Sequence, residues 1–544
     1  MAKTILNFGD LLDDNGAHLG AGNPALIHGD RVVSWPEMTA RSNNVGRWLL
    51  ANGAKIGDKI GFYMRNQPEY VEGLAASFKA RLTHVNVNYR YLDDELVYII
   101  DNSDSTVVLY DIEFRDNVVR VKDRLPNVKI WVEVGGGADA PDFAVAYEGL
   151  ASNGDGAALD IERSPDDLMF LYTGGTTGMP KGVMWSHGIW RDSNLDGMRR
   201  IYGAAPENWE QHRAFVNETG RHSRQLPACP LMHGTGLFTA LGAFLNGGAI
   251  VTLETKAKFL PDELWGTVAR HGVTAMAIVG DAFAKPMLKV LEEAPARYDL
   301  SSVASITSSG VMWSMEVKQG LIEHIPQVAL MDSFGASEAV GFGMSVTTAE
   351  GVSETAKFEI GEHCKVFSED GREIAPGSDE TGLIARGGSV PLGYYKDEKK
   401  TAETFRTIDG VRYAIPGDWC KVAADGTLTL LGRGSNCINS AGEKIYPEEV
   451  EEALKEHDSV RDALVVGVPD DKWGQAVTGV VELADGAAAD EDTLRAFVRT
   501  KLAAYKAPKR VLFSPDLKRA PNGKADYKTI RAFAYDQLGI PSEA

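Results

Sequence analysis

The sequence is poor in cysteine and lacks the long apolar run that a membrane span requires. Its 544 residues include four cysteines, and no two of them form a CxxC pair or a zinc-ligand spacing. This usage argues against a disulfide framework and predicts reduced thiols in a cytoplasmic protein. The N-terminal segment has no signal-peptide core, and no stretch approaches the roughly 18 apolar residues of a membrane span. We therefore expect no integral membrane segment.

Positive charge is also scarce. The chain has 56 basic and 76 acidic residues, for a formal net charge of −20. A nucleic-acid-binding surface needs a basic footprint, so this balance argues against nucleic acid as a partner. An anionic ligand would have to be drawn by local positive charge. Apolar residues make up 44% of the chain, which fits a well-packed globular protein, and its length suggests several domains.

A stretch rich in glycine and threonine occupies residues 173–182. Apolar residues 168–172 precede it and residues 183–185 follow it, so the pattern predicts a loop between two strands. Its glycines let the backbone approach a ligand, and successive N–H groups in such a loop form an anion-binding concavity. The stretch therefore predicts polyphosphate binding. Its candidate ligand-binding residues are Thr173, Gly174, Gly175, Thr176, Thr177, Gly178 and Lys181.

Two other interpretations of this loop are weaker. A Walker A loop needs G-x-x-x-x-G-K-[ST] at the start of a helix. Here Gly182 follows Lys181, and Met179 and Pro180 separate that lysine from Gly178. A P-loop kinase or ATPase is therefore disfavoured. A glycine-rich surface turn without function remains as the structural alternative.

The first three fifths of the chain alternate helical and strand-like patterns, which predicts parallel α/β layers. Ser34 predicts a helix N-cap, and Asn52–Gly53 predicts the end of that helix. Predicted strands end near His233, Gly310 and Glu338. Ligands collect beyond the carboxyl ends of strands in open α/β sheets, so these ends are candidate sites.

The remaining segments differ in pattern. Polar residues 205–224 predict a surface excursion with solvated His212 and His222. From about residue 357, short strands and turns predict a β-rich part. A boundary near residues 432–436 predicts two domains, 1–434 and 435–544.

Taken together, six short motifs resemble the adenylate-forming superfamily of acyl-CoA synthetases, adenylation domains and luciferases. The similarity runs from about residue 20 to 535. The motifs, in the family's order and approximate spacing, are the glycine loop, Phe334–Glu338, Pro416–Asp418, Gly432–Arg433, Gly442–Ile445 and Pro521–Lys524.

This resemblance implies a fold and a reaction. The fold is a large N-terminal domain of two α/β subdomains and a β-barrel-like part, followed by a small mobile α+β C-terminal lid. A carboxylate first attacks the α-phosphate of ATP and gives acyl-AMP and pyrophosphate. The lid then rotates, and a thiol, usually of CoA, displaces AMP. Mg²⁺, ATP and CoA are the implied cofactors and co-substrates.

The resemblance also implies roles for single residues. Lys524 would bridge the carboxylate and the α-phosphate, Glu338 would bind Mg²⁺ with Thr176, and Ser337 and His233 would complete the catalytic set. The nucleotide would further contact Gly310, Val311, Asp332, Phe334, Gly335, Asp418 and Arg433. The acyl pocket would include His233, Gly236, Ser309, Gly310 and Met312, the CoA tunnel Gly442 and Lys444, and the hinge Ser435 and Asn436.

The sequence departs from the family at several of these positions. Ser337 stands where threonine is common, and its hydroxyl is retained. Ser435 and Asn436 occupy the hinge in place of Asp or Lys, and Asn439 replaces a frequent lysine. Hinge motion remains plausible because Asn tolerates unusual backbone dihedrals.

The segments expected to line the acyl pocket contain apolar and small residues, and Asp281 is their only acidic residue. This composition favours an uncharged acyl tail. Residues 179–185 resemble synthetases for medium-to-long, branched or ring-bearing acids. Two alternatives stay open: an enzyme that passes acyl-AMP to a carrier protein or another acceptor, and a non-catalytic nucleotide-binding homologue. A homodimer is expected from the family.

Overall fold

The computed structural model describes residues 5–173, 179–311, 313–351, 357–361, 363–436, 438–440, 443–470, 474–502, 504–519 and 525–541. The side chains of Arg433, Ser435, Asn439, Glu443, Lys444 and Gly474 lie outside this description. The chain divides into two compact units. Unit 1 comprises residues 1–355, 361–363 and 386–414, and unit 2 comprises residues 356–360, 364–385 and 415–544.

One sheet of unit 1 is mainly parallel and has buried strands, as expected where helices cover both faces. Its order is β19 (Gly393–Tyr394), β9 (Lys181–Ser186), β8 (Leu168–Thr173), β4 (Thr83–Asn86), β3 (Lys59–Tyr63), β5 (Ser105–Asp111), β6 (Ile130–Val134) and β7 (Ala144–Ala146). The antiparallel pair β8 and β9 carries the predicted hairpin, with Thr173 opposite Lys181.

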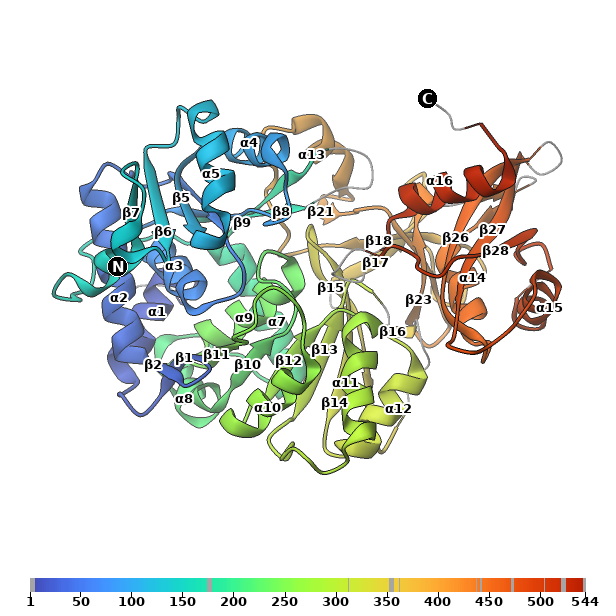
Figure 1. Ribbon diagram of the computed structural model, residues 1–544, viewed down its shortest axis with the longest axis horizontal. Helices are drawn as coiled ribbons and strands as arrows, with labels where there is room; N and C mark the ends of the chain where they lie inside the picture. The colour runs from blue at the N-terminus through green and yellow to red at the C-terminus, as the bar shows by residue number, and fades with distance from the viewer. Residues whose placement is uncertain are drawn as a thin grey trace. The chain divides into compact units, whose positions relative to one another are not determined.

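The second sheet of unit 1 carries a parallel run that ends with an antiparallel strand. Its order is β2 (Arg31–Ser34), β1 (Pro24–His28), β11 (Ala249–Thr252), β10 (Arg224–Pro227), β12 (Ala275–Ile278), β13 (Ser305–Ser309), β14 (Ala329–Ala336) and β15 (Ala339–Thr347). Figure 1 shows α11 and α12 alongside the strands β12–β14. Trp265 and Trp313, both almost fully buried, belong to the apolar core of this layer.

The helices of unit 1 begin where caps and proline predict. Ser34 accepts a hydrogen bond from the Glu37 N–H at the start of α2, and proline opens α3 and α10. Their bounds are α1 (Phe8–His18), α2 (Trp35–Ala51), α3 (Pro68–Lys79), α4 (Asp93–Asn102), α5 (Arg115–Val121), α6 (Tyr147–Ser152), α7 (His187–Tyr202), α8 (Trp209–Glu218), α9 (Gly234–Leu245), α10 (Pro261–His271), α11 (Asp281–Glu293), α12 (Met315–His324) and α13 (Glu398–Thr404). A hairpin, β20 (Phe405–Ile408) and β21 (Val411–Ala414), follows α13.

One prediction for unit 1 is wrong. The polar stretch 205–224 contains α8, capped by the Asn208 side chain, which accepts from the Gln211 N–H. His212 on this helix is fully buried, and the Arg191 side chain lies 3.5 Å from its Nδ1. Burial lowers the pKa of His212 to about 3. A mostly polar helix can still hide one face, so composition alone misplaced this histidine. His222 is exposed, as expected.

Unit 2 contains the predicted β-rich part and an α+β part. Strands β16 (Lys357–Ile360), β23 (Thr427–Arg433), β22 (Asp418–Val422) and β18 (Gly382–Arg386) lie in that order, and β17 (Cys364–Phe367) pairs with β18. The other sheet has the order β25 (Glu443–Ile445), β24 (Ile438–Ser440), β27 (Gly474–Leu483), β26 (Val460–Asp470), with β28 (Arg510–Phe513) on β27. Helices α14 (Pro447–Lys455), α15 (Glu491–Lys501) and α16 (Tyr527–Leu538) lie beside this sheet in Figure 1.

By contacts, the β-rich segments therefore group with the C-terminal part of the chain. The predicted domain boundary between residues 434 and 435 stays a prediction. Within the described residues, no helix is both long and apolar enough to cross a membrane.

Candidate functional site

Parallel strands of unit 1 bring several predicted site residues to one sheet edge. Strands β10, β12, β13 and β14 are neighbours, and their registers align Ile278 with Ser308 and Ser309 with Ser333. Their carboxyl ends therefore lie together. Segments that follow these ends contain His233, Asp281, Gly310 and Glu338. This arrangement is the one expected of a ligand site in an α/β sheet.

The turn after β13 is fixed by small side chains. Gly310 has φ +88°, a left-handed conformation that favours glycine. The Ser308 hydroxyl accepts from the Gly280 N–H at 2.9 Å, which ties the end of β13 to the segment after β12. Ser309 is the last residue of β13, Val311 follows Gly310, and Met312 lies outside the described residues.

The Asp281 side chain binds the backbone of the segment that follows β13. Its Oδ1 accepts from the Ser314 N–H at 2.9 Å, and its Oδ2 lies 3.3 Å from the Lys285 ammonium. The carboxylate thus holds the segment after β13 and already has a cationic partner.

Strand β14 carries the next predicted residues. Asp332 is buried and forms an ion pair with the buried Lys318 of α12. Burial raises the pKa of Asp332, and the nearby Lys318 opposes that shift. Phe334 is buried and its ring centroid lies 5.2 Å from that of Phe342 on β15. Gly335 follows Phe334 near the end of the strand.

The turn between β14 and β15 presents Ser337 and Glu338. Glu338 is 8% exposed, and its Oε1 accepts from the Tyr394 hydroxyl at 2.6 Å. The Ser337 carbonyl oxygen accepts from the Trp185 indole N–H at 3.0 Å. Trp185 lies on β9 and Tyr394 on β19, so two neighbouring strands of the other sheet hold this turn.

Lys181 begins β9 and lies opposite Thr173 in the register. Its side chain is 40% exposed and forms an ion pair with Asp397. That pairing, through a hydrogen bond from Lys181, lowers the pKa of Asp397. Residues 174–178, which include Gly174, Gly175, Thr176, Thr177 and Gly178, lie outside the described part of the chain.

The segment that leads to His233 is held by two asparagines. The Asn66 amide donates to the carbonyl oxygens of Pro227 and Cys229 at 3.1 and 3.0 Å, and its Oδ1 accepts from the Leu231 N–H at 2.7 Å. The Asn86 amide donates to the carbonyl oxygens of Tyr172 and Met232, at 2.9 and 2.7 Å. The backbone path from β10 into α9 is therefore specified by one side chain in the loop after β3 and one at the end of β4.

His233 is the N-cap residue of α9, in an extended conformation. Gly236 lies in the first turn of this helix, where an added Cβ would come within 2.4 Å of the Pro230 carbonyl oxygen. Only glycine permits this close backbone approach. Gly236 therefore shapes the predicted acyl wall through the backbone.

The predicted residues of unit 2 are described in part. Asp418 begins β22, is 8% exposed and lies opposite Arg433 in the strand register. Gly417, with φ +107°, makes the turn before it. Asn436 lies in a short helical turn after β23. The side chains of Arg433, Ser435 and Lys444, and the whole of Gly442 and Lys524, lie outside the description.

Local residue patterns did not predict the contacts of Asn66, Asn86, Trp185, Tyr394 and Asp397. Their partners lie far away in the sequence: Tyr394 is 56 residues from Glu338, and Asp397 is 216 residues from Lys181. Short-range patterns carry no such information. The Gly393–Tyr394 pair was the available signal, since a glycine beside aromatics can mark a close backbone approach.

The site could bind Mg²⁺ through one carboxylate, that of Glu338, together with substrate phosphates and water. Among the described residues, no group of three or more His, Cys, Asp and Glu side chains could hold a metal ion alone. Mg²⁺ in nucleotide sites is usually bound by one or two carboxylates together with substrate phosphates and water. The buried Glu338 carboxylate, held by Tyr394, fits that mode.

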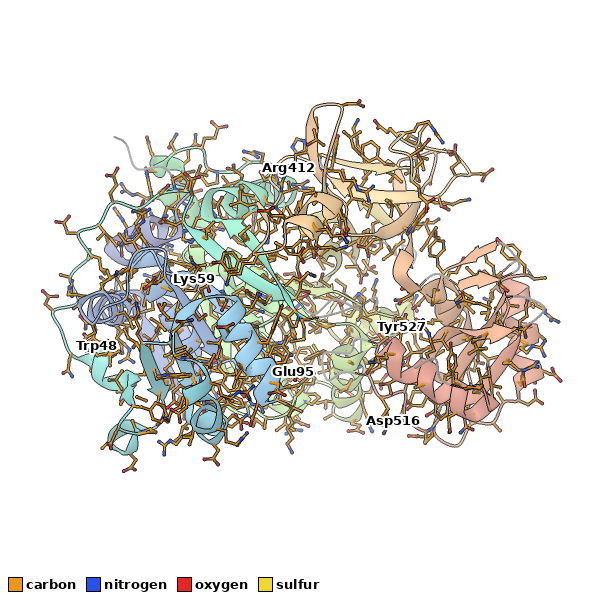
Figure 2. All side chains as sticks on the ribbon, turned by 90° about the horizontal axis from the view of Figure 1, so that it is seen from above. Trp48, Lys59, Glu95, Arg412, Asp516 and Tyr527 are labelled. Carbon is orange, nitrogen blue, oxygen red and sulfur yellow. The ribbon has the colours of Figure 1, made fainter. Side chains whose placement is uncertain are left out.

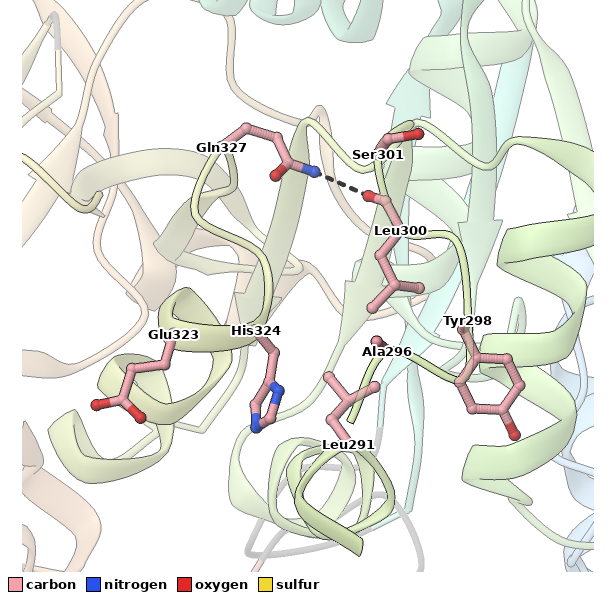
Figure 3. Close-up of a pocket in the computed structure, with 8 residues that line it drawn as sticks. All are labelled: Leu291, Ala296, Tyr298, Leu300, Ser301, Glu323, His324 and Gln327. Carbon is pink, nitrogen blue, oxygen red and sulfur yellow. Dashed lines mark hydrogen bonds between the residues drawn. The ribbon is translucent and has the colours of Figure 1, made fainter. Parts of the chain in front are cut away.

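A separate open pocket lies between α11, α12 and the segments that follow them. Figure 3 shows its lining, in which the Gln327 amide donates to the Leu300 carbonyl oxygen at 2.8 Å. The lining residues are Leu291, Ala296, Tyr298, Leu300, Ser301, Glu323, His324 and Gln327. No predicted site residue belongs to this set, so we do not assign the reaction to it.

Comparisons with known proteins identify the family of the chain. The model of the AMP-binding enzyme family matches residues 13–395, and that of the AMP-binding enzyme C-terminal domain matches residues 449–524. The chain is 40% identical to the 3-oxocholest-4-en-26-oate–CoA ligase of Rhodococcus rhodochrous, over 98% of this chain and 96% of that protein. It is also 40% identical to a medium/long-chain-fatty-acid–CoA/3-oxocholest-4-en-26-oate–CoA ligase of Mycolicibacterium smegmatis, over 93% and 92% of the two chains.

The crystal structure of ATP-bound MatB from Rhodopseudomonas palustris superposes with a TM-score of 0.81 at 24% identity. That match covers 98% of this chain and 100% of the other. At this identity the likeness concerns the fold, and it confirms the predicted α/β architecture with a large N-terminal and a small C-terminal part.

Proposed function

The chain belongs to the AMP-binding enzyme family, and we propose that it uses ATP to join an apolar carboxylic acid to CoA. It is an enzyme of the acid–thiol ligase class, an AMP-forming acyl-CoA synthetase. The observation that carries the proposal is the sheet edge of unit 1, where Glu338, Gly310 and His233 follow neighbouring strand ends.

In the first step, one oxygen of the substrate carboxylate attacks the α-phosphorus of ATP. The bond from that phosphorus to the bridging oxygen breaks, and pyrophosphate leaves with the electron pair. An anion attacking a polyanion is repelled, so the site must supply positive charge. Lys181 would bind the β- and γ-phosphates, which leave as pyrophosphate, and Lys524 would stabilise charge at the α-phosphate. Mg²⁺, when bound through Glu338, would neutralise further phosphate charge.

In the second step, the CoA thiolate attacks the acyl carbon, and AMP leaves as the carbon–oxygen bond breaks. Asp418 would accept hydrogen bonds from the ribose hydroxyls, with Arg433 beside it in the register. Gly442 and Lys444 would border the CoA tunnel. Movement of the C-terminal part about Ser435 and Asn436 would separate the two steps.

The acid is proposed to be medium-to-long, branched or ring-bearing. Two relatives at 40% identity are named for a steroid side-chain acid, and one of them also for fatty acids. In this chain, Asp281 is engaged by Ser314 and Lys285, so the described acyl-side segments present no uncommitted carboxylate for a substrate amine. These contacts support an uncharged acyl tail.

A panel of apolar acids, scored by CoA-dependent AMP release, tests the proposal directly. We expect turnover with a subset of steroid side-chain, branched or medium-to-long-chain acids. Hydroxylamine in place of CoA traps acyl-AMP and separates the first step from the second. AMP release with a phosphopantetheinyl carrier protein but not with CoA would favour the carrier alternative. No acyl-hydroxamate from any acid would favour a non-catalytic homologue.

Two further features belong to the proposal. The cysteine usage supports a cytoplasmic enzyme, and a homodimer is proposed as the family resemblance implies. Sedimentation of the purified chain at several concentrations tests the second point, because a homodimer would sediment with twice the mass of one chain.

A further inference from the structure

A short segment of unit 1 contacts both Glu338, the predicted Mg²⁺ ligand, and Lys181, the predicted phosphate-binding lysine. Residues 391–397, here called the 391–397 segment, run along β9. Strand β19 within it pairs with β9, so that Tyr394 lies opposite Val183. The Tyr395 N–H donates to the Gly182 carbonyl oxygen at 2.8 Å. The segment is thus attached directly beside the strand that begins with Lys181.

Further contacts hold this backbone in place. Arg412, labelled in Figure 2, donates to the carbonyl oxygens of Pro391 and Leu392 at 2.6 and 2.9 Å. The Tyr394 N–H donates to the Thr401 hydroxyl at 2.9 Å. Gly393 has φ +144°, and a Cβ there would lie 2.5 Å from the Thr401 methyl group. The side chains that follow Gly393 are therefore directed by a well-specified backbone.

Two of these side chains touch groups of the proposed site. The Tyr394 hydroxyl donates to Glu338 Oε1 in buried surroundings. Asp397 forms the ion pair with Lys181 and also caps α13, where its Oδ1 accepts from the Lys400 N–H at 2.9 Å. One segment thus contacts both the carboxylate expected to bind Mg²⁺ and the lysine expected to bind phosphate.

We propose that Tyr394 and Asp397 are positioning residues with opposite effects on the phosphate side of the site. Tyr394 orients the Glu338 carboxylate for Mg²⁺, and Asp397 is a counter-charge that polyphosphate must displace from Lys181. The inference rests on the proposed function, because it assigns ATP and Mg²⁺ to these groups.

The opposite effects follow from the chemistry of each contact. A hydrogen bond to a metal-binding carboxylate fixes its orientation, and loss of such a partner typically weakens metal binding about 10–100-fold. An ion pair between partly exposed groups is weak and competes with another anion for the same lysine. Removing the Tyr394 hydroxyl should weaken the binding of the metal ion, whereas removing the charge of Asp397 should strengthen the binding of polyphosphate.

Tyr394→Phe tests the first half of the proposal. The probe is Mn²⁺, titrated into the full-length protein with saturating α,β-methylene-ATP and followed by electron paramagnetic resonance. We expect the dissociation constant for Mn²⁺ to rise about tenfold. Tyr395→Phe is the matched control, since the Tyr395 hydroxyl donates to Asp104 at 2.7 Å and contacts neither Glu338 nor Lys181. That control should bind Mn²⁺ like the wild type.

Asp397→Asn tests the second half, with inorganic pyrophosphate as the probe in metal-free calorimetry. Asparagine is an equally good helix cap, so the start of α13 should persist. We expect pyrophosphate to bind about two- to fivefold more tightly, as loss of a partly exposed ion pair implies.

The outcomes separate this inference from the proposed function. Unchanged Mn²⁺ binding in Tyr394→Phe, or unchanged or weaker pyrophosphate binding in Asp397→Asn, overturns the inference while the wild-type protein still binds both probes. If the wild-type protein binds neither probe, the proposed function itself fails. Melting temperatures of all variants exclude a general loss of folding as the cause of weaker binding.

Discussion

Each unit contains a buried glutamate that accepts a hydrogen bond from a tyrosine hydroxyl, yet the two pairs have different surroundings. In unit 1, Tyr394 donates to Glu338 at 2.6 Å in a turn beyond a strand end. In unit 2, Tyr527, labelled in Figure 2, donates to Glu451 at 3.0 Å. Glu451 also accepts from the Val465 N–H of β26, at 2.9 Å. The first pair lies at a candidate ligand edge and the second ties helices to a sheet.

The difference teaches that a buried acid with a tyrosine partner does not by itself identify a site. Glu451 is 5% exposed, and burial raises its pKa to about 7. Perturbed acids are often functional, but structural networks perturb acids as well. Position relative to strand ends separates the two cases here. We therefore expect Glu338 to matter for chemistry and Glu451 for the fold of unit 2.

The largest effect is expected for a substitution of Lys524, the proposed catalytic residue of unit 2. Lys524 is three residues before Tyr527 in the sequence. If the Glu451–Tyr527 pair is structural, acyl-AMP formation should depend on Lys524, which is proposed to stabilise charge at the α-phosphate, and not on that pair. Lys524→Ala should lower the rate of acyl-AMP formation about 10³-fold, as loss of a charge-stabilising group does. Carboxylate-dependent pyrophosphate exchange measures this step.

Two results complete that test. Thioester formation from supplied acyl-AMP should survive in Lys524→Ala, and Lys528→Ala, at an exposed lysine of the same tail, should behave as the wild type. Undiminished pyrophosphate exchange in Lys524→Ala would contradict the assignment.

The next effect concerns the glutamate of unit 1. Glu338→Gln keeps the size of the side chain and an oxygen that can accept from Tyr394, but it removes the negative charge. We expect kcat/KM to fall about 10²-fold because Mg²⁺ loses its protein carboxylate. The half-saturating Mg²⁺ concentration should rise, whereas the melting temperature should stay near that of the wild type. A large loss of stability with normal Mg²⁺ dependence would make Glu338 structural and erase the contrast with Glu451.

Much of the fold was predictable because its signals are local. The Ser34 cap and the two strands that flank the glycine loop, predicted from the apolar residues 168–172 and 183–185, lie where the sequence placed them. The α8 helix was missed because it buries one side of a polar stretch.

The candidate site was predictable where motifs are contiguous, as at Phe334–Glu338. Its supporting contacts were not, since Asn66, Tyr394 and Asp397 act on residues 56 to 216 positions away. Such pairings depend on strand order, which one sequence does not specify. The Glu338–Tyr394 and Glu451–Tyr527 pairs are both of this kind.

A smaller effect is expected at Asn66, which supports the acid side of the site and has no charge. Asn66→Ala removes three hydrogen bonds to the segment between Pro227 and Leu231. Small displacements of a binding wall reduce catalysis without abolishing it, so we expect the KM for the acid to rise about tenfold. The KM for ATP should change less, because the Glu338–Tyr394 pair does not involve this segment. Initial-rate kinetics with each substrate varied in turn would check this, and an equal rise in both values would contradict it.

The smallest effect is a pH dependence in unit 2. Glu451 has a folded-state pKa of about 7, above its ordinary value of 4.5, because burial disfavours the charged carboxylate. The folded state therefore binds more protons than the unfolded state between these values, and the contribution of Glu451 to stability is lost as pH rises toward 7. Lys455 and Arg519 limit this shift without cancelling it, so we expect the stability of unit 2 to decline between pH 5 and pH 7.5. Glu451→Gln keeps an oxygen for Val465 and Tyr527 and should remove this decline. Hydrogen exchange at the Val465 amide, corrected for intrinsic rates, would report it, and an identical pH slope in the variant would show that another group titrates.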